Sequence, residues 1–439
     1  MLLTRRTFLK GTAATVILSS SCRDAFEAKP NIVVVLVDQL RKQAADDWMP
    51  GVNALASAGV RFEAMRAAAP WTYPSVVSMF SGLYPQQHGA DGEMEGPVLS
   101  IFDKAVPLMH RNLRAGGYTT AAFVTNPFLG LWNPFHIGFD SFNTDFIEDL
   151  GPARGGVHQR FETNRMYADN VDAAIQDHFG SRSRVGPEFT YVHYIDVHGP
   201  WIEGVPFAAD YRSAVEYIDR RIVDLYRYFM RRYDDDLIFL LTADHGRSVK
   251  DDLEVGYGPF YRKNKLSVHD FNLKIPCMIF PSRHVIESRT ILDSCSNIDI
   301  NPTLLDWAGM GSEPALPART LLPAIQGNGT FADRVVYSRV SAFGGHSDAI
   351  TWRDRKYMRY FDLDTGETIV ERVFDLLNDP RETVSRGEIS ENARQLLKTA
   401  SGKHGTSFAT RYEPVDRDLR ERLRALGYLD ADETASWSR

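Results

Sequence analysis

The 439-residue chain contains only three cysteines, and no two of them form a Cys-x-x-Cys pair. A zinc site built on paired thiolates is therefore disfavoured. Cys277 lies in the apolar run 275–280, which indicates a buried and inert thiol. A disulfide between Cys277 and Cys295 is the alternative in an oxidising compartment, but the strict geometry of such a bridge makes it the less favoured interpretation.

The sequence also has no excess of positive charge. It carries 50 Lys and Arg residues against 57 Asp and Glu residues, which gives a net charge of -7. This balance argues against non-specific binding to nucleic acid or to an anionic membrane. An anionic substrate would have to be held by local positive charge or by a metal ion. No internal repeat or low-complexity segment is visible, and the 44% of hydrophobic residues suffices for a large core.

The apolar stretch at residues 11–18 is too short to anchor the chain across a bilayer. It follows the segment 4–10, which reads TRRTFLK, and paired arginines before such a stretch indicate twin-arginine export. We therefore expect residues 1–28 to be a signal segment read by the twin-arginine machinery, and the mature protein to be periplasmic or extracellular. An ordinary signal with a basic start is the alternative. A lipid anchor at Cys22 is disfavoured, because serines precede it instead of an aliphatic residue.

From residue 31 onward, strand patterns alternate with helix patterns. The run 32–37 is apolar and rich in β-branched residues, which predicts a strand buried on both faces. The same criteria predict strands at 119–124, 189–194, 237–242 and 275–280. Helical patterns predict helices at 53–58, 161–179, 214–231 and 299–307. This alternation predicts an α/β fold with a mostly parallel sheet sandwiched by helices.

Beyond about residue 319 the pattern changes. Short strands are expected at 335–340, 349–353 and 356–361, and a basic amphipathic helix at 416–426. These elements predict a small antiparallel sheet with a helix, packed on the main domain. The expected division is a signal segment at 1–28, a catalytic α/β domain at 29–319, and a small C-terminal α+β subdomain with a tail at 320–439.

Acidic, amide and imidazole side chains follow three of the predicted strands. In open α/β sheets, ligands bind at the carboxyl ends of the strands. One such Asp is more often a helix cap, but three strands that deliver these groups to one edge favour a divalent cation such as calcium, magnesium or manganese. The side chains are those of Asp38 and Gln39, of Asp196 and His198, and of Asp244 and His245.

Thr72 lies two residues before Pro74, a residue suited to the first turn of a helix. Its hydroxyl is expected just before that helix, near backbone N–H groups and the positive end of the helix dipole, where an anionic tetrahedral group can be held. A hydroxyl bound there to a cation can ionise and attack in line. The alternative is that Thr72 or Ser75 only caps the helix. The local sequence weighs equally for both interpretations.

The segment from Thr72 to Gly89 resembles the sulfatase signature of the alkaline-phosphatase superfamily, with Pro74, Ser75, Ser78, the pair Ser81-Gly82, the pair Tyr84-Pro85 and His88 at matching positions. Other segments are similar to the same family in the same order, namely 31–39, 55–62, 113–120, 194–200, 242–246, 297–309 and 423–429. The resemblance covers nearly the whole mature chain. It implies an alkaline-phosphatase-like fold and a hydrolase of charged esters.

The resemblance also implies roles for individual residues. Thr72 occupies the nucleophile position. His198 is implied to lie near the leaving group, as a hydrogen-bond donor or general acid, and Lys265 to contact the substrate anion. The implied metal ligands are Asp38, Gln39, Asp244 and His245.

Zinc-paired relatives have a histidine four residues after the aspartate that matches Asp196, whereas this chain has Pro200. One divalent metal ion is therefore expected, and zinc is the less favoured identity. His193, His269 and His346 are the remaining candidates for a second site, but a structural or solvated histidine is the favoured interpretation of each.

The chain departs from true sulfatases at the nucleophile. Those enzymes carry a cysteine or serine, oxidised to formylglycine, where Thr72 stands, and an arginine where Val76 stands. A family lysine is replaced by Asn126, which is expected to donate a neutral hydrogen bond to the substrate. Threonine cannot become the aldehyde, and each lost cationic contact is worth about 1.5–3 kcal/mol. A singly charged diester tolerates these losses better than a dianion.

We therefore expect an exported, metal-dependent hydrolase that cleaves phosphoesters, phosphodiesters or phosphonoesters through a covalent threonine intermediate. The substrate would be a small-molecule, glycan or lipid ester. One alternative is a sulfuric ester hydrolase that works without formylglycine. The other is an inactive relative that binds glycans, although the retained Asp38, Asp244, His245 and His198 speak against it.

Overall fold

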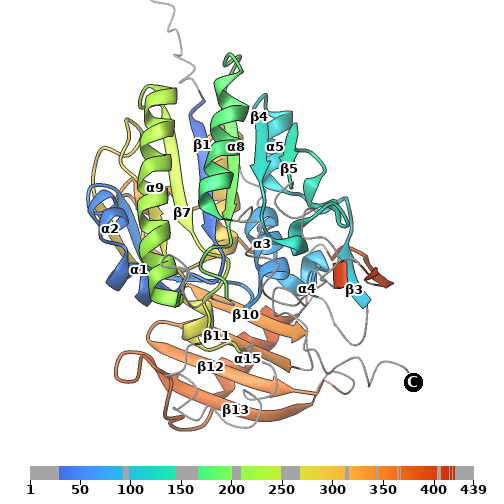
Figure 1. Ribbon diagram of the computed structural model, residues 1–439. Helices are drawn as coiled ribbons and strands as arrows, with labels where there is room; N and C mark the ends of the chain where they lie inside the picture. Colours follow the sequence, from blue (N-terminus) through green and yellow to red (C-terminus); the bar gives the residue numbers. More distant parts are fainter. Residues whose placement is uncertain are drawn as a thin grey trace, which may run out of the picture.

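The computed structural model describes residues 29–91, 98–144, 167–199, 209–248, 267–311, 316–342, 345–362, 365, 367–402, 407–414, 416–417 and 419–420. The main body is a sheet covered by helices, and a smaller antiparallel sheet lies below it in the view of Figure 1. This arrangement confirms the predicted fold class.

The main sheet has eight strands in the order β5-β4-β6-β1-β7-β8-β2-β9. Its pairs are parallel, except that β8 runs antiparallel to both neighbours. The strands are β1 (Asn31–Val37), β2 (Val60–Arg66), β4 (Thr119–Phe123), β5 (Ser141–Asn143), β6 (Glu188–Tyr194), β7 (Leu237–Thr242), β8 (Cys277–Ile279) and β9 (Arg289–Ser296).

The five strands predicted for this sheet are all present, but the pattern missed three others, namely the short strand β5 and the strands β2 and β9. β2 and β9 pair in parallel at one end of the sheet. β2 alternates buried and half-buried residues, and the edge strand β9 includes exposed Leu292, so neither shows the continuous apolar run of a central strand. The strand predicted at 275–280 is shorter, because only Cys277 to Ile279 form ladder bonds.

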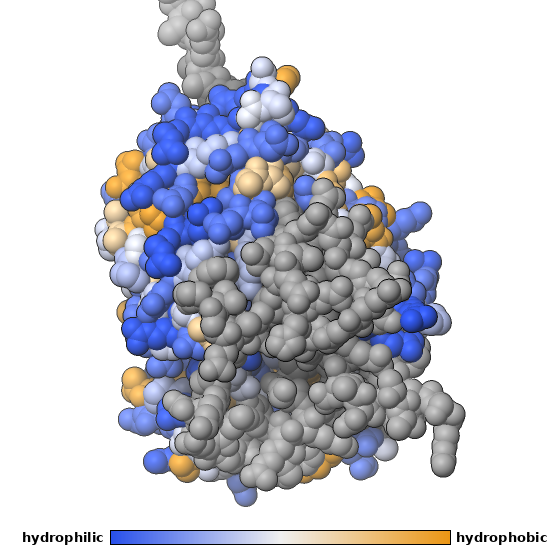
Figure 2. Space-filling view, in the orientation of Figure 1, coloured by the Kyte–Doolittle hydropathy of each residue, from blue (hydrophilic) through white to orange (hydrophobic). Residues whose placement is uncertain are grey.

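Helices cover both faces of the sheet. On one face, α1 (Lys42–Trp48), α2 (Pro50–Ala56) and α8 (Ala168–Gly180) pack against α9 (Tyr211–Tyr233), and Figure 1 shows α8 and α9 in front of the strands. On the other face, α3 (Thr72–Ser81), α5 (Met109–Ala115) and α13 (Ile300–Trp307) pack together. The surface over α8 and α9 is mostly hydrophilic (Figure 2), as expected for amphipathic helices with one face turned to solvent.

Short helical turns complete the main body. They are α4 (Pro85–His88), η1 (Pro127–Leu129), η2 (Pro134–His136), α12 (Asp270–Leu273), η4 (Asn297–Asp299) and α14 (Leu322–Ile325). The helix predicted at 299–307 is thus split into the 3-10 turn η4 and the α-helix α13. The helix predicted at 161–179 corresponds to α8 where the chain is described, and residues 161–166 lie outside the described residues.

The smaller sheet contains β10 (Val335–Ala342), β11 (Gly345–Trp352), β12 (Arg355–Phe361) and β13 (Thr368–Asp375), in that order and all antiparallel. The helix α15 (Glu391–Ser401) packs on β10 and β11. β13 and α15 were not predicted, and most of the helix expected at 416–426 lies outside the described residues. The boundary near residue 319 stays a prediction.

Near the C-terminus the chain returns to the main body. β14 (Thr410–Pro414) pairs antiparallel with β3 (Val98–Phe102), far away in sequence. Among the described residues, no helix combines the length and apolar character needed to cross a membrane. Cys277 and Cys295 are buried free thiols on β8 and β9, the two neighbours of β2. The favoured interpretation of Cys277 is confirmed and the disulfide is not formed.

Candidate functional site

The carboxyl ends of β6, β1 and β7 lie side by side, because β1 pairs in parallel with both other strands. Leu36 on β1 stands opposite His193 on β6 and Thr242 on β7. Paired residues share a face of the sheet, and the face repeats every second residue. Asp38 and Asp244, each two residues further on, therefore emerge on the face that His193 occupies.

The three side chains converge at this edge. One ligand atom from each of Asp38, His193 and Asp244 lies within 4.8 Å of the other two, and all three residues are buried. Two carboxylates this close repel each other strongly in a dry interior unless a positive charge separates them. The donor set of oxygen and imidazole nitrogen fits a divalent cation.

Asp38 also contacts the predicted nucleophile. The Thr72 hydroxyl donates to Asp38 Oδ2 at 3.4 Å, and the Asn126 amide donates to the same oxygen at 2.6 Å. Asn126 Nδ2 lies 3.4 Å from Thr72 Oγ1 as well. The side-chain oxygen Oδ1 of Asn126 accepts from Phe128 N at 2.9 Å, which fixes the orientation of the side-chain amide. The structure thus brings together three of the residues singled out from the sequence.

Thr72 is the first residue of α3, and extended Trp71 is the N-cap. The expectation that Thr72 precedes the helix is therefore wrong by one residue. Pro74 still falls in the first turn, where its missing N–H costs no helix hydrogen bond. Ser75 does not cap either, because its hydroxyl donates to the Asp244 carbonyl at 2.5 Å. Both hydroxyls of the first turn are directed to the strand ends.

Asp244 is oriented by backbone donors. Its Oδ1 accepts from Gln39 N at 3.0 Å and from His245 N at 2.8 Å. Its Oδ2 has no hydrogen-bond partner among the described residues and lies 3.4 Å from His245 Nε2. The carboxylate therefore offers one oxygen to a ligand at the site.

Gln39 adopts a left-handed backbone conformation, with φ of 61°. Its carbonyl accepts from the Tyr211 hydroxyl at 3.0 Å, and its side-chain oxygen accepts from Arg247 Nη1 at 3.0 Å. These contacts from α9 and from the segment after β7 hold a conformation that non-glycine residues rarely adopt. Metal ligation by Gln39 stays a prediction, since its amide oxygen is bound here by Arg247.

His193 was considered from sequence only as a second-site candidate, with a structural role favoured. The structure places its Nε2 at 3.7 Å from Asp38 Oδ2 and its Nδ1 at 3.1 Å from Thr125 Oγ1. Complete burial lowers its pKa to about 4, so the ring is neutral at neutral pH, which is the form that binds metals. Its position next to the end of a central strand was the only signal in the sequence.

The other two histidines stand elsewhere. His269 is hydrogen-bonded to Ser267 and stacks on Phe271, and His346 on β11 lies 3.2 Å from Ser341 Oγ. Neither belongs to the cluster around Asp38. The structural interpretation fits both.

His198 lies in the turn after β6 and is buried. Its Nδ1 is 2.5 Å from the Gly199 carbonyl, which can only accept, so Nδ1 carries a proton. The role of His198 near the leaving group stays a prediction. Asp196 instead turns away from the cluster, since its Oδ1 accepts from Ala168 N at the start of α8 at 2.9 Å. The helix-cap alternative is therefore correct for Asp196.

Cationic side chains are scarce around the described part of the site. Val76 is fully buried in the core, where the family arginine would stand. Lys265, the predicted contact to the substrate anion, lies outside the described residues. Trp132 packs on Tyr73 with a centroid separation of 5.3 Å and donates to Pro127 O, so it serves core packing.

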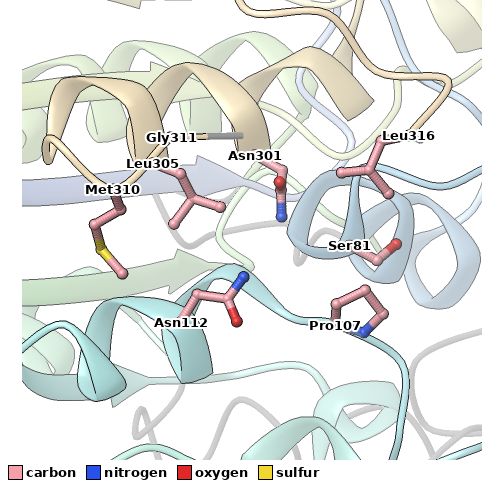
Figure 3. Close-up of a pocket in the computed structure, with 8 residues that line it drawn as sticks. All are labelled: Ser81, Pro107, Asn112, Asn301, Leu305, Met310, Gly311 and Leu316. Carbon is pink, nitrogen blue, oxygen red and sulfur yellow. The ribbon is translucent and has the colours of Figure 1, made fainter. Parts of the chain in front are cut away.

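A separate pocket of about 280 Å³ lies at the other end of α3. Figure 3 shows that side chains from α3, α5 and α13 line it and point toward one another. Ser81, one of them, is nine residues beyond Thr72, about 14 Å along a helix. None of its lining residues is charged, and the pocket is separate from the cluster around Asp38. Its lining is Ser81, Pro107, Asn112, Asn301, Leu305, Met310, Gly311 and Leu316.

Known proteins resemble the chain over most of its length. The family model described as Sulfatase matches residues 30–310. The choline-sulfatase of Rhizobium meliloti (strain 1021) is 23% identical over 85% of this chain and 85% of its own length.

Solved structures share the fold. BT4656, in complex with its substrate D-glucosamine-2-N,6-O-disulfate, superposes with a TM-score of 0.64 at 15% identity, covering 92% of this chain and 99% of the other. The phosphonate monoester hydrolase of Silicibacter pomeroyi has a TM-score of 0.62 at 15% identity, covering 88% of this chain and 100% of the other.

Proposed function

The chain belongs to the sulfatase family of the alkaline-phosphatase superfamily, and we propose on that basis that it is a metal-dependent hydrolase of phosphoesters, phosphodiesters or phosphonoesters. The observation that carries the proposal is the position of the Thr72 hydroxyl. It stands at the first residue of α3, 3.4 Å from Asp38 Oδ2 and beside the buried pair Asp38 and Asp244. A helix N-terminus next to a cation site can hold a tetrahedral anion.

The residues present fit one divalent cation. Asp38, Asp244 and His193 face one another, and Asp244 Oδ2 has no other hydrogen-bond partner among the described residues. His245 adds a nitrogen 3.4 Å from that oxygen. A bound cation would lower the pKa of the Thr72 hydroxyl and neutralise charge on the transferred group.

The steps follow from the side chains. Thr72 Oγ1 forms a bond to phosphorus in line with the leaving oxygen, and its proton has an acceptor in Asp38 Oδ2. The bond from phosphorus to the leaving oxygen breaks, and protonated His198 supplies a proton through Nε2. Water then attacks phosphorus, neutral His198 takes a proton from the water, the bond from phosphorus to Thr72 Oγ1 breaks, and Asp38 returns the proton to Thr72 Oγ1. Asn126 Nδ2, 3.4 Å from Thr72 Oγ1, orients the nucleophile.

The choice of phosphorus over sulfur rests on the nucleophile and on charge. A threonine ester must be hydrolysed by water, because Thr72 has no aldehyde hydrate through which to expel the group. Val76 and Asn126 are neutral where the family places an arginine and a lysine, which favours singly charged esters. The fold is shared both with a phosphonate monoester hydrolase and with BT4656, whose printed substrate is disulfated, so the fold is compatible with either ester. Similarity to choline-sulfatase supports the alternative, a sulfuric ester hydrolase.

The cellular setting is part of the proposal. The segment 4–10 supports twin-arginine export to the periplasm or beyond. Among the substrate classes, a glycan ester gains support from BT4656, whose printed substrate is a disulfated amino sugar. We take a glycan, lipid or small-molecule ester as the substrate.

The test compares wild type, Thr72→Ser and Thr72→Ala on bis-p-nitrophenyl phosphate, p-nitrophenyl phenylphosphonate and p-nitrophenyl sulfate, with each candidate metal. We expect the phosphorus esters to be cleaved, Thr72→Ser to keep part of the rate, and Thr72→Ala to lose roughly 10³-fold or more in kcat. Quenched reactions should yield a peptide phosphorylated at Thr72. Turnover of the sulfate ester alone would establish the sulfatase alternative. No turnover of any ester with any metal would leave the inactive, glycan-binding relative.

A further inference from the structure

We propose that His193 binds the metal through Nε2, and that this nitrogen makes the site select a first-row transition ion such as zinc or manganese over calcium and magnesium. The inference rests on the metal site of the proposed function and deepens it. It changes the expectation from sequence, in which calcium, magnesium and manganese were equal candidates and zinc was disfavoured.

The protonation of His193 follows from its neighbour Thr125. Thr125 Oγ1 is 2.8 Å from the His193 carbonyl, which can only accept, so the single hydroxyl proton is directed there. The same Oγ1 is 3.1 Å from His193 Nδ1 and must accept from it. Nδ1 therefore carries the ring proton, and Nε2 presents a lone pair. An outer partner that fixes the tautomer in this way is typical of histidine ligands.

The lone pair of Nε2 faces a carboxylate. Nε2 is 3.7 Å from Asp38 Oδ2, has no hydrogen-bond partner among the described residues, and belongs to a side chain with 0% exposure. Asp244 contributes a third acceptor within 4.8 Å. His193 Nε2 and Asp244 Oδ2 are buried acceptors without a hydrogen-bond donor among the described residues, which is unfavourable beside a second carboxylate. A cation among them satisfies all three.

His245 repeats the pattern from the other side. Its Nδ1 is 2.6 Å from the Gly246 carbonyl and so carries the proton, which leaves a lone pair on Nε2 at 3.4 Å from Asp244 Oδ2. Two imidazole nitrogens thus accompany the two carboxylates of Asp38 and Asp244. The chain builds a mixed nitrogen and oxygen donor set.

Such a donor set decides between classes of metal. Calcium takes six to eight oxygen ligands and magnesium prefers oxygen with retained water, whereas imidazole suits zinc and other first-row transition ions. Oxygen donors are limited here, because Asp244 Oδ1 accepts two backbone N–H groups and the Gln39 amide oxygen accepts from Arg247. The imidazole nitrogens of His193 and His245 supply further ligands for the metal ion.

The experiment uses the purified mature protein, stripped with a chelator and dialysed against calcium, magnesium, manganese and zinc at equal concentrations. Metal content is then measured by mass spectrometry. We expect one equivalent of zinc or manganese and little calcium. Wild type loaded with manganese alone should show directly coordinated ¹⁴N in pulsed electron paramagnetic resonance, a readout that needs neither a variant nor turnover. Predominant calcium or magnesium loading, or absence of coupled nitrogen, would overturn the proposal.

Variants assign the nitrogen. We expect His193→Gln to lose at least tenfold in zinc affinity and one nitrogen coupling, and Thr125→Val to lose about 10–100-fold, as outer partners of histidine ligands do. His269→Gln, a substitution of a buried histidine outside the cluster, is the matched control and should bind as wild type. Unchanged zinc affinity and coupling in a folded His193→Gln would refute the role of His193.

The result is separable from the proposed hydrolase. Thr72→Ala should still load zinc or manganese and keep the nitrogen coupling of wild type, because His193, His245 and the two carboxylates are unchanged. If wild type loads zinc through His193 but cleaves no ester, the metal inference stands and the hydrolase fails. If Thr72-dependent turnover occurs on a protein that loads predominantly calcium, and the manganese-loaded protein lacks nitrogen coupling, the hydrolase stands and the metal inference fails.

Discussion

At the scale of residues, Asp38 contacts several of the proposed site residues through a single carboxylate oxygen, Oδ2. It accepts from Thr72 and Asn126 and lies beside His193, so one carboxylate contacts the proposed nucleophile, a neutral donor and an imidazole. Because Asn126 is neutral and Val76 is buried, the positive charge at the proposed site would come from the metal ion. A change at a single residue here should act on chemistry more than on folding.

His198 gives a prediction that depends on the leaving group. We expect His198→Gln to lower kcat/KM about 10²–10⁴-fold on an alkyl phosphoester, whose alkoxide needs a proton as it leaves. A p-nitrophenyl ester should lose far less, because p-nitrophenolate leaves without a proton. Steady-state kinetics on both esters measure the difference. The matched control is His178→Gln, a histidine of α8 outside the site, and equal losses on the two esters would contradict general-acid catalysis.

At the scale of elements, the register of β6 against β1 and the start of α3 place the reactive groups. α3 is joined to the strand ends by Ser75, whose hydroxyl donates to the Asp244 carbonyl and accepts from Asn297 Nδ2 at 2.9 Å. Asn297 in turn accepts from Ala68 N at 2.9 Å through Oδ1. This buried polar chain fixes the first turn of α3, and so Thr72, relative to Asp244.

The buried carboxyl of Asp196, which binds the start of α8, should make the stability of the protein depend on pH. Burial raises the pKa of Asp196 to about 7, despite the hydrogen bond from Ala168 N. The folded state thus holds a proton that the unfolded carboxyl, with a pKa of about 3.9, releases. The stabilisation is complete below about pH 4 and is lost as pH rises through 7, with a slope of at most about 1.4 kcal/mol per pH unit.

Asp196→Asn tests this dependence, because asparagine keeps the acceptor for Ala168 N and cannot titrate. Urea unfolding between pH 4.5 and 8 should show a shallower fall in the free energy of unfolding than wild type shows. Some slope should remain, since burial also raises the pKa of Asp172 to about 6. An unchanged slope would mean that Asp196 is ionised throughout.

At the scale of the whole molecule, a buried charge network joins the two sheets. Arg66 on β2 and Lys356 on β12 both bind Asp270, and Lys356 also lies 2.9 Å from Glu382. Burial alone would raise the pKa of Asp270, but Arg66 and Lys356 outweigh it and hold that pKa well below its usual range. Asp270 opens α12, whose Asn272 carbonyl accepts from Gly246 N at 2.6 Å. The network therefore also supports the segment after Asp244.

Lys356→Met should destabilise the protein by about 3–5 kcal/mol, because it removes the cation and leaves Glu382 and Asp270 buried with too little positive charge. The control is Arg353→Ala, three residues before Lys356. It breaks an exposed ion pair with Asp333 and should cost at most about 1 kcal/mol. Urea denaturation at neutral pH measures both. A loss below about 1 kcal/mol in Lys356→Met would show that the network does not hold the sheets together.

The sequence by itself determined the parts that depend on local pattern. The β-branched run of β1 and the amphipathic repeat of α9 predicted their elements, because burial on two faces or on one leaves a direct trace in residue order. The strand ends predicted the edge where the site lies. The strands β9 and β13 left no such trace, since most of their residues are exposed or half-buried and show no continuous apolar run.

Only the tertiary structure decided which side chains meet at that edge. His193 and Asp196 both lie near the end of β6, yet His193 faces Asp38 and Asp196 faces the start of α8. The difference comes from the register of β6 against β1, which sets the face that each side chain takes. Register is fixed by packing between segments some 150 residues apart in sequence, which no local pattern records.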